Sequence, residues 1–353
     1  MNLPELNRVT LQRTAEALLI GAAGGGVASL IDIPAALISG SVLAVAAAAI
    51  AGRPVIVPAP LARGVFVVIG IALGAIVTPE TLRGFAAYPL TLLLLAVSTF
   101  GMIAATTFYL YKVHRWDPLS ALFGASPGAL AQVMAMAAEA DAEMRAIVIV
   151  QTIRVVMLTV GVPSGLELFG LADLPVIRGP VGITAAPLDL LLLIVASVVP
   201  ALILHRLRFS GGWLFGAMLG SALLHGTGAV HGTLPDWLVS ATVIALGAIT
   251  GARFANTSVR MLLVFLRAAF GSFAVAITVA AAFMVAVAWI VDERPANIVI
   301  AFVPGAQDTM MVLALALHLD PVFVAVHQIA RYVIVSASIP FIASVIQTRR
   351  SKR

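Results

Sequence analysis

The sequence predicts an all-α integral membrane protein with two inverted-topology repeats, each built from five transmembrane helices and one re-entrant or broken helix. Three observations support this fold class. Hydrophobic residues make up 61% of the 353 residues, charged residues only 10%, and the mean hydropathy is +1.09, which is typical of a polytopic membrane protein. A motif in residues 117–157 recurs in residues 294–334 at a constant offset of 177. The lysines and arginines also gather on one side of the membrane in the inverted arrangement.

The apolar segments follow the same order in both halves. In the first half they cover residues 15–32, 35–52, 62–78, 88–111 and 144–166, with a broken segment at 117–138. In the second half they cover residues 187–204, 211–228, 237–254, 262–290 and 321–346, with a broken segment at 296–317. A proline-rich linker lies near 167–186, so we predict one repeat over residues 1–178 and the other over 179–353. The polar start of the chain, Met1–Thr14, does not resemble a cleavable signal peptide.

The third predicted span of each half carries a Gly-x-x-x-Gly motif. Gly70 and Gly74 align with Gly247 and Gly251 at the same offset. Glycines four residues apart share one face of a helix and allow a neighbouring helix to approach closely. The motifs therefore predict tight helix packing in both repeats.

Each broken segment contains a Pro-Gly-Ala sequence, at 127–129 in the first half and at 304–306 in the second. Proline and glycine interrupt a helix and free backbone groups. Within a membrane such groups are tolerated only where protein or water satisfies them. The second half-helix after a break also begins with free N–H groups and the positive end of its dipole, which favour an anion. We therefore expect the breaks to line a binding site.

The basic residues distinguish two topologies. If the broken segment crosses the membrane, each half has six spans, and 12 basic residues lie on the N-terminal side against 7 on the other. If it is re-entrant, the counts become 16 and 3, with Arg154 and Arg331 inside helices in either case. The positive-inside rule favours the second arrangement, in which both termini are cytoplasmic. A discontinuous full crossing stays open as the alternative.

Buried arginines are the principal candidates for ligand binding. Arg154 and Arg331 lie near the middle of their spans, three residues after Gln151 and Gln328. A charge at this depth needs a partner or an aqueous cavity. One arginine could pair with Asp308, and the bidentate guanidinium of the other would suit a carboxylate or phosphate. The candidate substrate-binding residues are Ser126, Gly128, Gln132, Gln151, Arg154, Gly305, Gln307, Asp308, His327, Gln328 and Arg331.

Catalytic and metal chemistry find little support. Residues 124–128 match the Gly-x-Ser-x-Gly pattern of serine hydrolases, but they lie between apolar helical runs, and the position that corresponds to Ser126 is Val303. The six histidines lack metal-ligand spacing, and there are no cysteines. His327 lies beside Gln328 and could line the same cavity or carry protons. We expect no enzyme activity, no metal and no cofactor.

The tandem duplication, the two Pro-Gly-Ala breaks and the following Gln-x-x-Arg resemble the AbrB family of bacterial inner-membrane proteins. That resemblance covers nearly the whole chain and implies a multi-pass protein of the bacterial inner membrane, labelled a regulator of gene expression or an ammonia monooxygenase. No segment outside the spans is long enough to fold as a DNA-binding module, so direct nucleic-acid binding is not expected.

The functional prediction is secondary transport of a small anionic solute, bound between the two broken segments. The alternative is a membrane-embedded sensor or regulator that influences gene expression without touching DNA, because both functions need a ligand cavity. The expected partners are the lipid bilayer and the small ligand. The sequence leaves homo-oligomerisation open.

Overall fold

The computed structural model describes residues 8–77, 88–127, 133–134, 136–137, 140, 142–171, 185–207, 209, 211–255 and 257–351. Every regular element in these ranges is a helix, which agrees with the predicted all-α class. Gly128 and Gln132 of the predicted site lie outside the described residues.

The chain divides into two compact units, and each unit takes segments from both halves of the sequence. Unit 1 comprises residues 1–83, 159–258 and 311–322. Unit 2 comprises residues 84–158, 259–310 and 323–353. The units therefore cut across the duplicated halves, because corresponding helices of the two repeats fall in the same unit.

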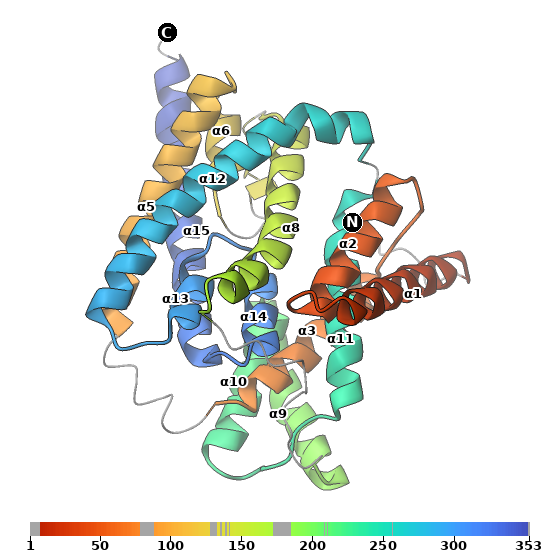
Figure 1. Cartoon of the computed structure of the whole chain (residues 1–353). Coiled ribbons are helices and arrows are strands. Elements are labelled where there is room, and N and C mark those ends of the chain that lie inside the picture. The colour runs from red at the N-terminus through yellow and green to blue at the C-terminus, as the bar shows by residue number, and fades with distance from the viewer. Residues whose placement is uncertain are drawn as a thin grey trace. The chain divides into compact units, whose positions relative to one another are not determined.

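Unit 1 contains the first three helices of each repeat (Figure 1). These are α1 (Arg8–Leu30), α2 (Ala36–Ile50), α3 (Ala59–Gly74), α9 (Pro187–Arg206), α10 (Gly212–Gly226) and α11 (Asp236–Gly251), which continues into the short 3-10 helix η2 (Ala252–Phe254). Packing is reciprocal between the repeats, since α3 packs against α10 and α2 packs against α11. Within each repeat, α1 packs against α2 and α9 against α10.

The Gly-x-x-x-Gly motifs lie at these reciprocal contacts. A Cβ atom added to Gly74 would lie only 2.5 Å from the carbonyl oxygen of Met218 in α10. One added to Gly251 would lie 2.8 Å from the carbonyl oxygen of Val42 in α2. The backbones of the paired helices thus approach too closely for any side chain, as the motif predicts.

Unit 2 contains most of the remaining helical residues. It comprises α5 (Tyr88–Val113), α6 (Pro118–Ala125), the first part of α8 (Met144–Leu168), α12 (Val259–Ile290), α13 (Pro295–Phe302), the first turn of α14 (Gln307–Ala316) and nearly all of α15 (Pro321–Ser351). The end of α8 and most of α14 belong to unit 1. The long helices α5 and α12 lie side by side (Figure 1). A core cluster joins α5, α6, α8 and α15 through residues such as Ile103, Phe123, Ile147 and Ile339.

Among the residues that the structure describes, six helices are long and apolar enough to cross a membrane: α5, α8, α9, α11 with η2, α12 and α15. The helices α2, α3 and α10 have 15, 16 and 15 residues. At 1.5 Å per residue such helices are roughly 23 Å long, shorter than a hydrocarbon core of about 30 Å. The structure thus has the character of a membrane protein, and the predicted total of ten spans stays a prediction.

Candidate functional site at the helix breaks

The first break ends the short helix α6. Asp117 caps its N-terminus, because Oδ1 accepts hydrogen bonds from the N–H groups of Leu119 and Ser120. The helix ends at Ala125, and Ser126 has an extended conformation with ψ of 120°. This is the conformation that a following proline imposes on the residue before it, here through Pro127.

The second break follows the same rules in α13. Pro295 occupies the first turn, the helix ends at Phe302, and Val303 is extended with ψ of 133° before Pro304. The N–H of Gly305 donates to the carbonyl of Val303 at 2.8 Å, and α14 begins at Gln307. A Cβ atom on Gly305 would lie 2.6 Å from Cε of Met310, so the glycine lets the turn fold onto the start of α14.

In the first repeat, the Gln-x-x-Arg motif of α8 donates hydrogen bonds to the end of α6. Gln151 Nε2 donates to the carbonyl of Phe123 at 2.8 Å. Arg154 donates to the carbonyls of Ala125, at 3.4 Å, and Ser126, at 3.0 Å. The backbone itself satisfies the preceding carbonyl, that of Leu122, through the N–H of Ser126.

The second repeat has the same arrangement. Gln328 Nε2 of α15 donates to the carbonyl of Ile300 at 3.0 Å, and Arg331 donates to the carbonyls of Ala301 and Val303. In both repeats the bond of the glutamine spans 28 residues. The two carbonyls that accept from glutamine thus occupy the same position of the repeat.

The physical reason for this motif lies in the ends of the short helices. The last four carbonyls of a helix have no partner within that helix. Water cannot satisfy them at membrane depth, so neighbouring side chains must. Arginine also places a positive charge at the negative end of the helix dipole. The Gln-x-x-Arg motif therefore caps the C-terminus of each broken helix.

The two arginines at the breaks are deeply buried. Arg154 is 4% exposed and Arg331 is 2% exposed. Asp308 lies half-buried in the first turn of α14, where Oδ1 accepts from the N–H of Thr309. The described part of the breaks thus carries two cations and one acid.

Three polar atoms at the second break are buried without a hydrogen-bond partner among the described residues: Arg331 Nε, Gln328 Oε1 and Thr309 Oγ1. Arg331 Nε can only donate, Gln328 Oε1 can only accept, and the hydroxyl can do both. An unsatisfied buried polar group destabilises a fold by about 1–3 kcal/mol unless water or a ligand completes it. The second break thus contains buried polar groups that the described residues leave unsatisfied.

His327 lies on α15 next to the motif and is fully buried. Its Nδ1 donates to the carbonyl of Phe323 at 2.8 Å, and its Nε2 lies 2.9 Å from Thr91 Oγ1 on α5. The rings of Tyr88, Phe302 and Phe323 surround it. The Thr91 hydroxyl also lies 2.9 Å from the carbonyl of Tyr88 in its own helix, to which it donates. His327 thus links α15 to α5 beside the second break.

The remaining predicted residues have local roles. The Ser126 hydroxyl donates to the carbonyl of Leu122 in its own helix at 2.7 Å. Gln307 Nε2 donates to the carbonyl of Gln328 at 3.1 Å, which ties the start of α14 to α15. In the part of the chain that the structure describes, no group of three or more histidines or carboxylates is placed to hold a metal ion.

The structure brings the predicted arginines, glutamines and His327 together in unit 2. The backbone carbonyls that accept from the arginines were not predicted, because only Asp308 and a ligand were expected as partners of the guanidiniums. One signal could have indicated them: the motif recurs at the same offset as the break it follows, and a helix of 8 residues leaves half its carbonyls without internal partners. Thr309 was also missed, because a single threonine in an apolar segment carries no pattern.

Comparisons with known proteins agree with this architecture. The family described as "Transition state regulatory protein AbrB" matches residues 8–347. The protein YhjN of Bacillus subtilis (strain 168), described as uncharacterized, is 25% identical over 355 residues, covering 92% of this chain and 90% of its own length. The family match runs from the first residue of α1 into the last turns of α15. The chain therefore belongs to the AbrB family.

Proposed function

We propose that this protein is a secondary transporter of a small anionic solute in the bacterial inner membrane, with its binding site at the helix breaks of unit 2. The observation that carries the proposal is the pair of broken helices, each capped by a Gln-x-x-Arg motif. Irregular backbone at membrane depth is tolerated where it lines a cavity, and discontinuous helices form the substrate sites of many secondary transporters.

The charge balance supports an anionic solute. Two buried guanidiniums and one carboxylate leave a net charge of about +1 at the breaks. A buried charge without compensation is unfavourable, so an anion would stabilise the site. The start of α14 adds the positive end of a helix dipole to the same region.

The unsatisfied atoms of the second break indicate where the solute would bind. A carboxylate or phosphate oxygen can accept from Arg331 Nε and from the Thr309 hydroxyl, both of which lack a partner in the described structure. The other donors of Arg331 are already held by carbonyls, so its position is fixed before a ligand arrives. Such preorganisation lowers the entropic penalty of binding.

The direction of packed helices supports the inverted-repeat topology. Gly70 of α3 lies against residues 214–218 of α10 and Gly74 against residues 218–222, so the two helices run in the same direction. Gly247 and Gly251 of α11 advance in the same way along α2.

Because α2 and α3 are consecutive spans joined by residues 51–58, they run in opposite directions if both cross the membrane. Since α11 runs parallel to α2, it runs opposite to its counterpart α3. Two repeats in the same orientation would make α11 antiparallel to α2. With inverted repeats and the positive-inside rule, both termini are cytoplasmic.

A second candidate function follows from the family description, which names a regulatory protein. A sensor would use the same ligand site but would pass the signal to another protein rather than move the solute. No catalytic step and no direct contact with nucleic acid belong to either proposal.

The test has two stages on the purified full-length chain. First, a thermal-shift screen with sodium salts of small carboxylates and phosphates should find a ligand that raises Tm, since a ligand at 100 times its Kd stabilises by about 2.7 kcal/mol. Second, proteoliposomes should accumulate the radiolabelled ligand under an ion gradient. Binding without flux would favour the sensor, and a shift produced only by cations or neutral solutes would refute an anionic substrate.

A further inference from the structure

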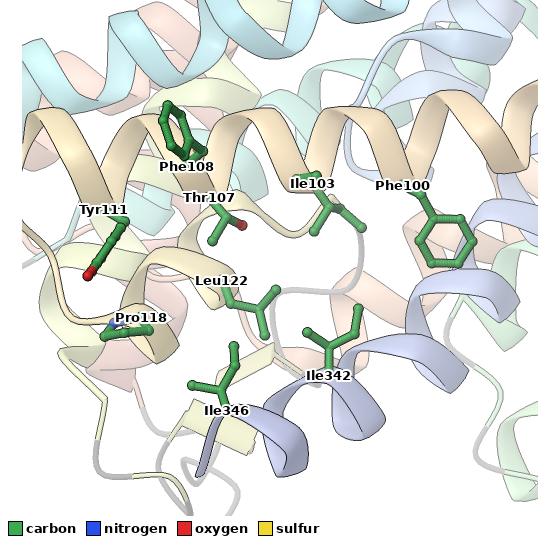
Figure 2. A pocket seen from close by; sticks show the side chains of 10 residues that line it. Phe100, Ile103, Thr107, Phe108, Tyr111, Pro118, Leu122, Ile342 and Ile346 are labelled. Atoms are coloured by element: carbon green, nitrogen blue, oxygen red, sulfur yellow. The ribbon is translucent and has the colours of Figure 1, made fainter. Parts of the chain in front are cut away.

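Unit 2 carries an apolar groove of about 470 Å³ whose lining includes none of the glutamines and arginines of the Gln-x-x-Arg motifs (Figure 2). Residues Phe100, Ile103 and Tyr111 of α5 form one wall, and Ile342 and Ile346 of α15 form the other. Leu122 of α6 forms the floor between them. The lining is almost entirely hydrocarbon, and the Thr107 hydroxyl oxygen is itself buried without a partner among the described residues.

The surroundings of this groove define what fills it. Both α5 and α15 are long and apolar enough to cross a membrane, so the groove lies at the depth of lipid tails. Phe100 and Phe108 are 44% and 64% exposed, which means that their rings face whatever occupies the groove or the bilayer beside it. In hydrocarbon surroundings an apolar groove is filled by acyl chains and not by water.

The groove has one basic end. Phe100 and Ile342 lie toward one end, whereas Tyr111 and Ile346 lie toward the other (Figure 2). At the Tyr111 end, Lys112 follows directly, with its ammonium 5.4 Å from the centre of the Tyr111 ring. Arg115 lies three residues after Lys112. Tyrosine and basic residues at the end of a span are typical of the headgroup region.

We infer that this groove binds one acyl chain of an anionic phospholipid, with the phosphate near Lys112 and the chain running toward Phe100. Lysine attracts a phosphate as a point charge, and a basic cluster beside a span recognises anionic lipid headgroups. A zwitterionic lipid fits the same hydrocarbon walls but gains less from the basic end. The site therefore selects by headgroup charge.

The chain offers well-matched variants for a test. Ala104 lines the groove and is exposed, and its counterpart at the repeat offset, Ala281 of α12, is exposed as well. Ala104→Trp fills the groove, whereas Ala281→Trp adds the same side chain elsewhere on unit 2. Lys112→Ala removes the charge at the basic end, and Arg260→Ala removes a charge from an exposed position in the first turn of α12.

The experiment is native mass spectrometry of the full-length protein in mild detergent with equal amounts of phosphatidylglycerol and phosphatidylcholine. The wild type should retain phosphatidylglycerol in at least several-fold excess. Ala104→Trp should lower total retained lipid several-fold, and Lys112→Ala should abolish the preference for phosphatidylglycerol. Ala281→Trp and Arg260→Ala should behave like the wild type.

Three results would overturn the inference: equal retention of the two lipids by the wild type, wild-type retention by Ala104→Trp, or a change of oligomeric state in Ala104→Trp with lipid unchanged, which would make the groove a subunit interface. Size-exclusion chromatography shows whether each variant is folded. If Ala104→Trp aggregates, the smaller Ala104→Leu applies the same test.

Discussion

The side chains of Gln151 and Gln328 each donate a hydrogen bond to the backbone of a neighbouring helix. The accepting carbonyls, of Phe123 in α6 and Ile300 in α13, lie in the last turn of a short helix and have no partner within that helix. The arginine three residues later does the same for the carbonyls at the break. These candidate ligand-binding residues thus also hold the break in shape, and a ligand would use the polar atoms that this role leaves free.

Replacing Gln328 by leucine should therefore destabilise the protein. The change leaves the carbonyl of Ile300 buried without its donor, which costs about 1–3 kcal/mol. Gln151→Leu should have an effect of similar size through Phe123. Gln347→Leu, an exposed position on α15, is the matched control and should leave stability within ~0.5 kcal/mol. Thermal unfolding in detergent measures all three, and equal Tm values for the three variants would contradict a capping role.

Thr309 provides a way to separate ligand binding from stability. Its hydroxyl is fully buried and has no partner among the described residues, so Thr309→Val removes an unsatisfied polar group and should not lower Tm. If that hydroxyl donates to the solute, the same change should weaken the affinity by about tenfold, the equivalent of ~1.4 kcal/mol.

The control for Thr309→Val is Thr250→Val in α11. The hydroxyl of Thr250 is also buried and has no partner in the described part of the chain, but it lies in unit 1. Ligand-induced Tm shifts should be smaller for the Thr309 variant only. A loss of the shift in both variants, or in neither, would remove Thr309 from the site.

Among the elements, helix positions were largely predictable and helix partners were not. The predicted segments 187–204 and 262–290 correspond to α9 and α12 within a few residues, because hydropathy and proline positions are local signals. Both breaks also begin where the residue before a proline must be extended. The Gly-x-x-x-Gly motif, by contrast, predicts a close contact without naming the partner. That α3 packs on α10 of the other repeat depends on the tertiary fold.

Gly74→Ala tests this reciprocal packing. The added methyl group would lie 2.5 Å from the Met218 carbonyl oxygen, so α3 and α10 must separate, with an expected loss of about 1–3 kcal/mol. Gly64→Ala in the same helix meets open space and should leave stability unchanged or raise it by up to ~1 kcal/mol, because alanine favours helix. The comparison needs only Tm values, and a Gly74 variant as stable as the Gly64 variant would show that the helices can move apart freely.

At the scale of the whole chain, duplication is visible in the sequence but the compact units are not. The offset of 177 residues identifies two halves, yet each unit contains corresponding helices of both. This follows from reciprocal packing, because α2 packs against α11 and α3 packs against α10. Each pair buries faces of small residues that would otherwise contact lipid. The sequence repeat therefore marks the duplicated unit and not the compact unit of the fold. Only the three-dimensional structure shows which helices associate in unit 2: α5, α6, α8, α12, α13 and α15.

The relative orientation of the two halves can be tested with single introduced cysteines, because the sequence contains no cysteine of its own. Glu143 and Asp320 occupy equivalent positions at the repeat offset, just before α8 and α15. In inverted repeats, Glu143→Cys should react with a membrane-impermeant maleimide only from the cytoplasmic side and Asp320→Cys only from the outside. Labelling of intact cells against inverted vesicles distinguishes these cases.

A reporter fused after Arg353 should also behave as cytoplasmic, because the basic tail is retained on that side. Asp320 Oδ1 accepts from the N–H of Val322, so its variant should lose about 1 kcal/mol of stability and needs a check of expression level before labelling is compared. If both cysteines react from the same side, the broken helices cross the membrane, and the two halves run in parallel with six crossings each.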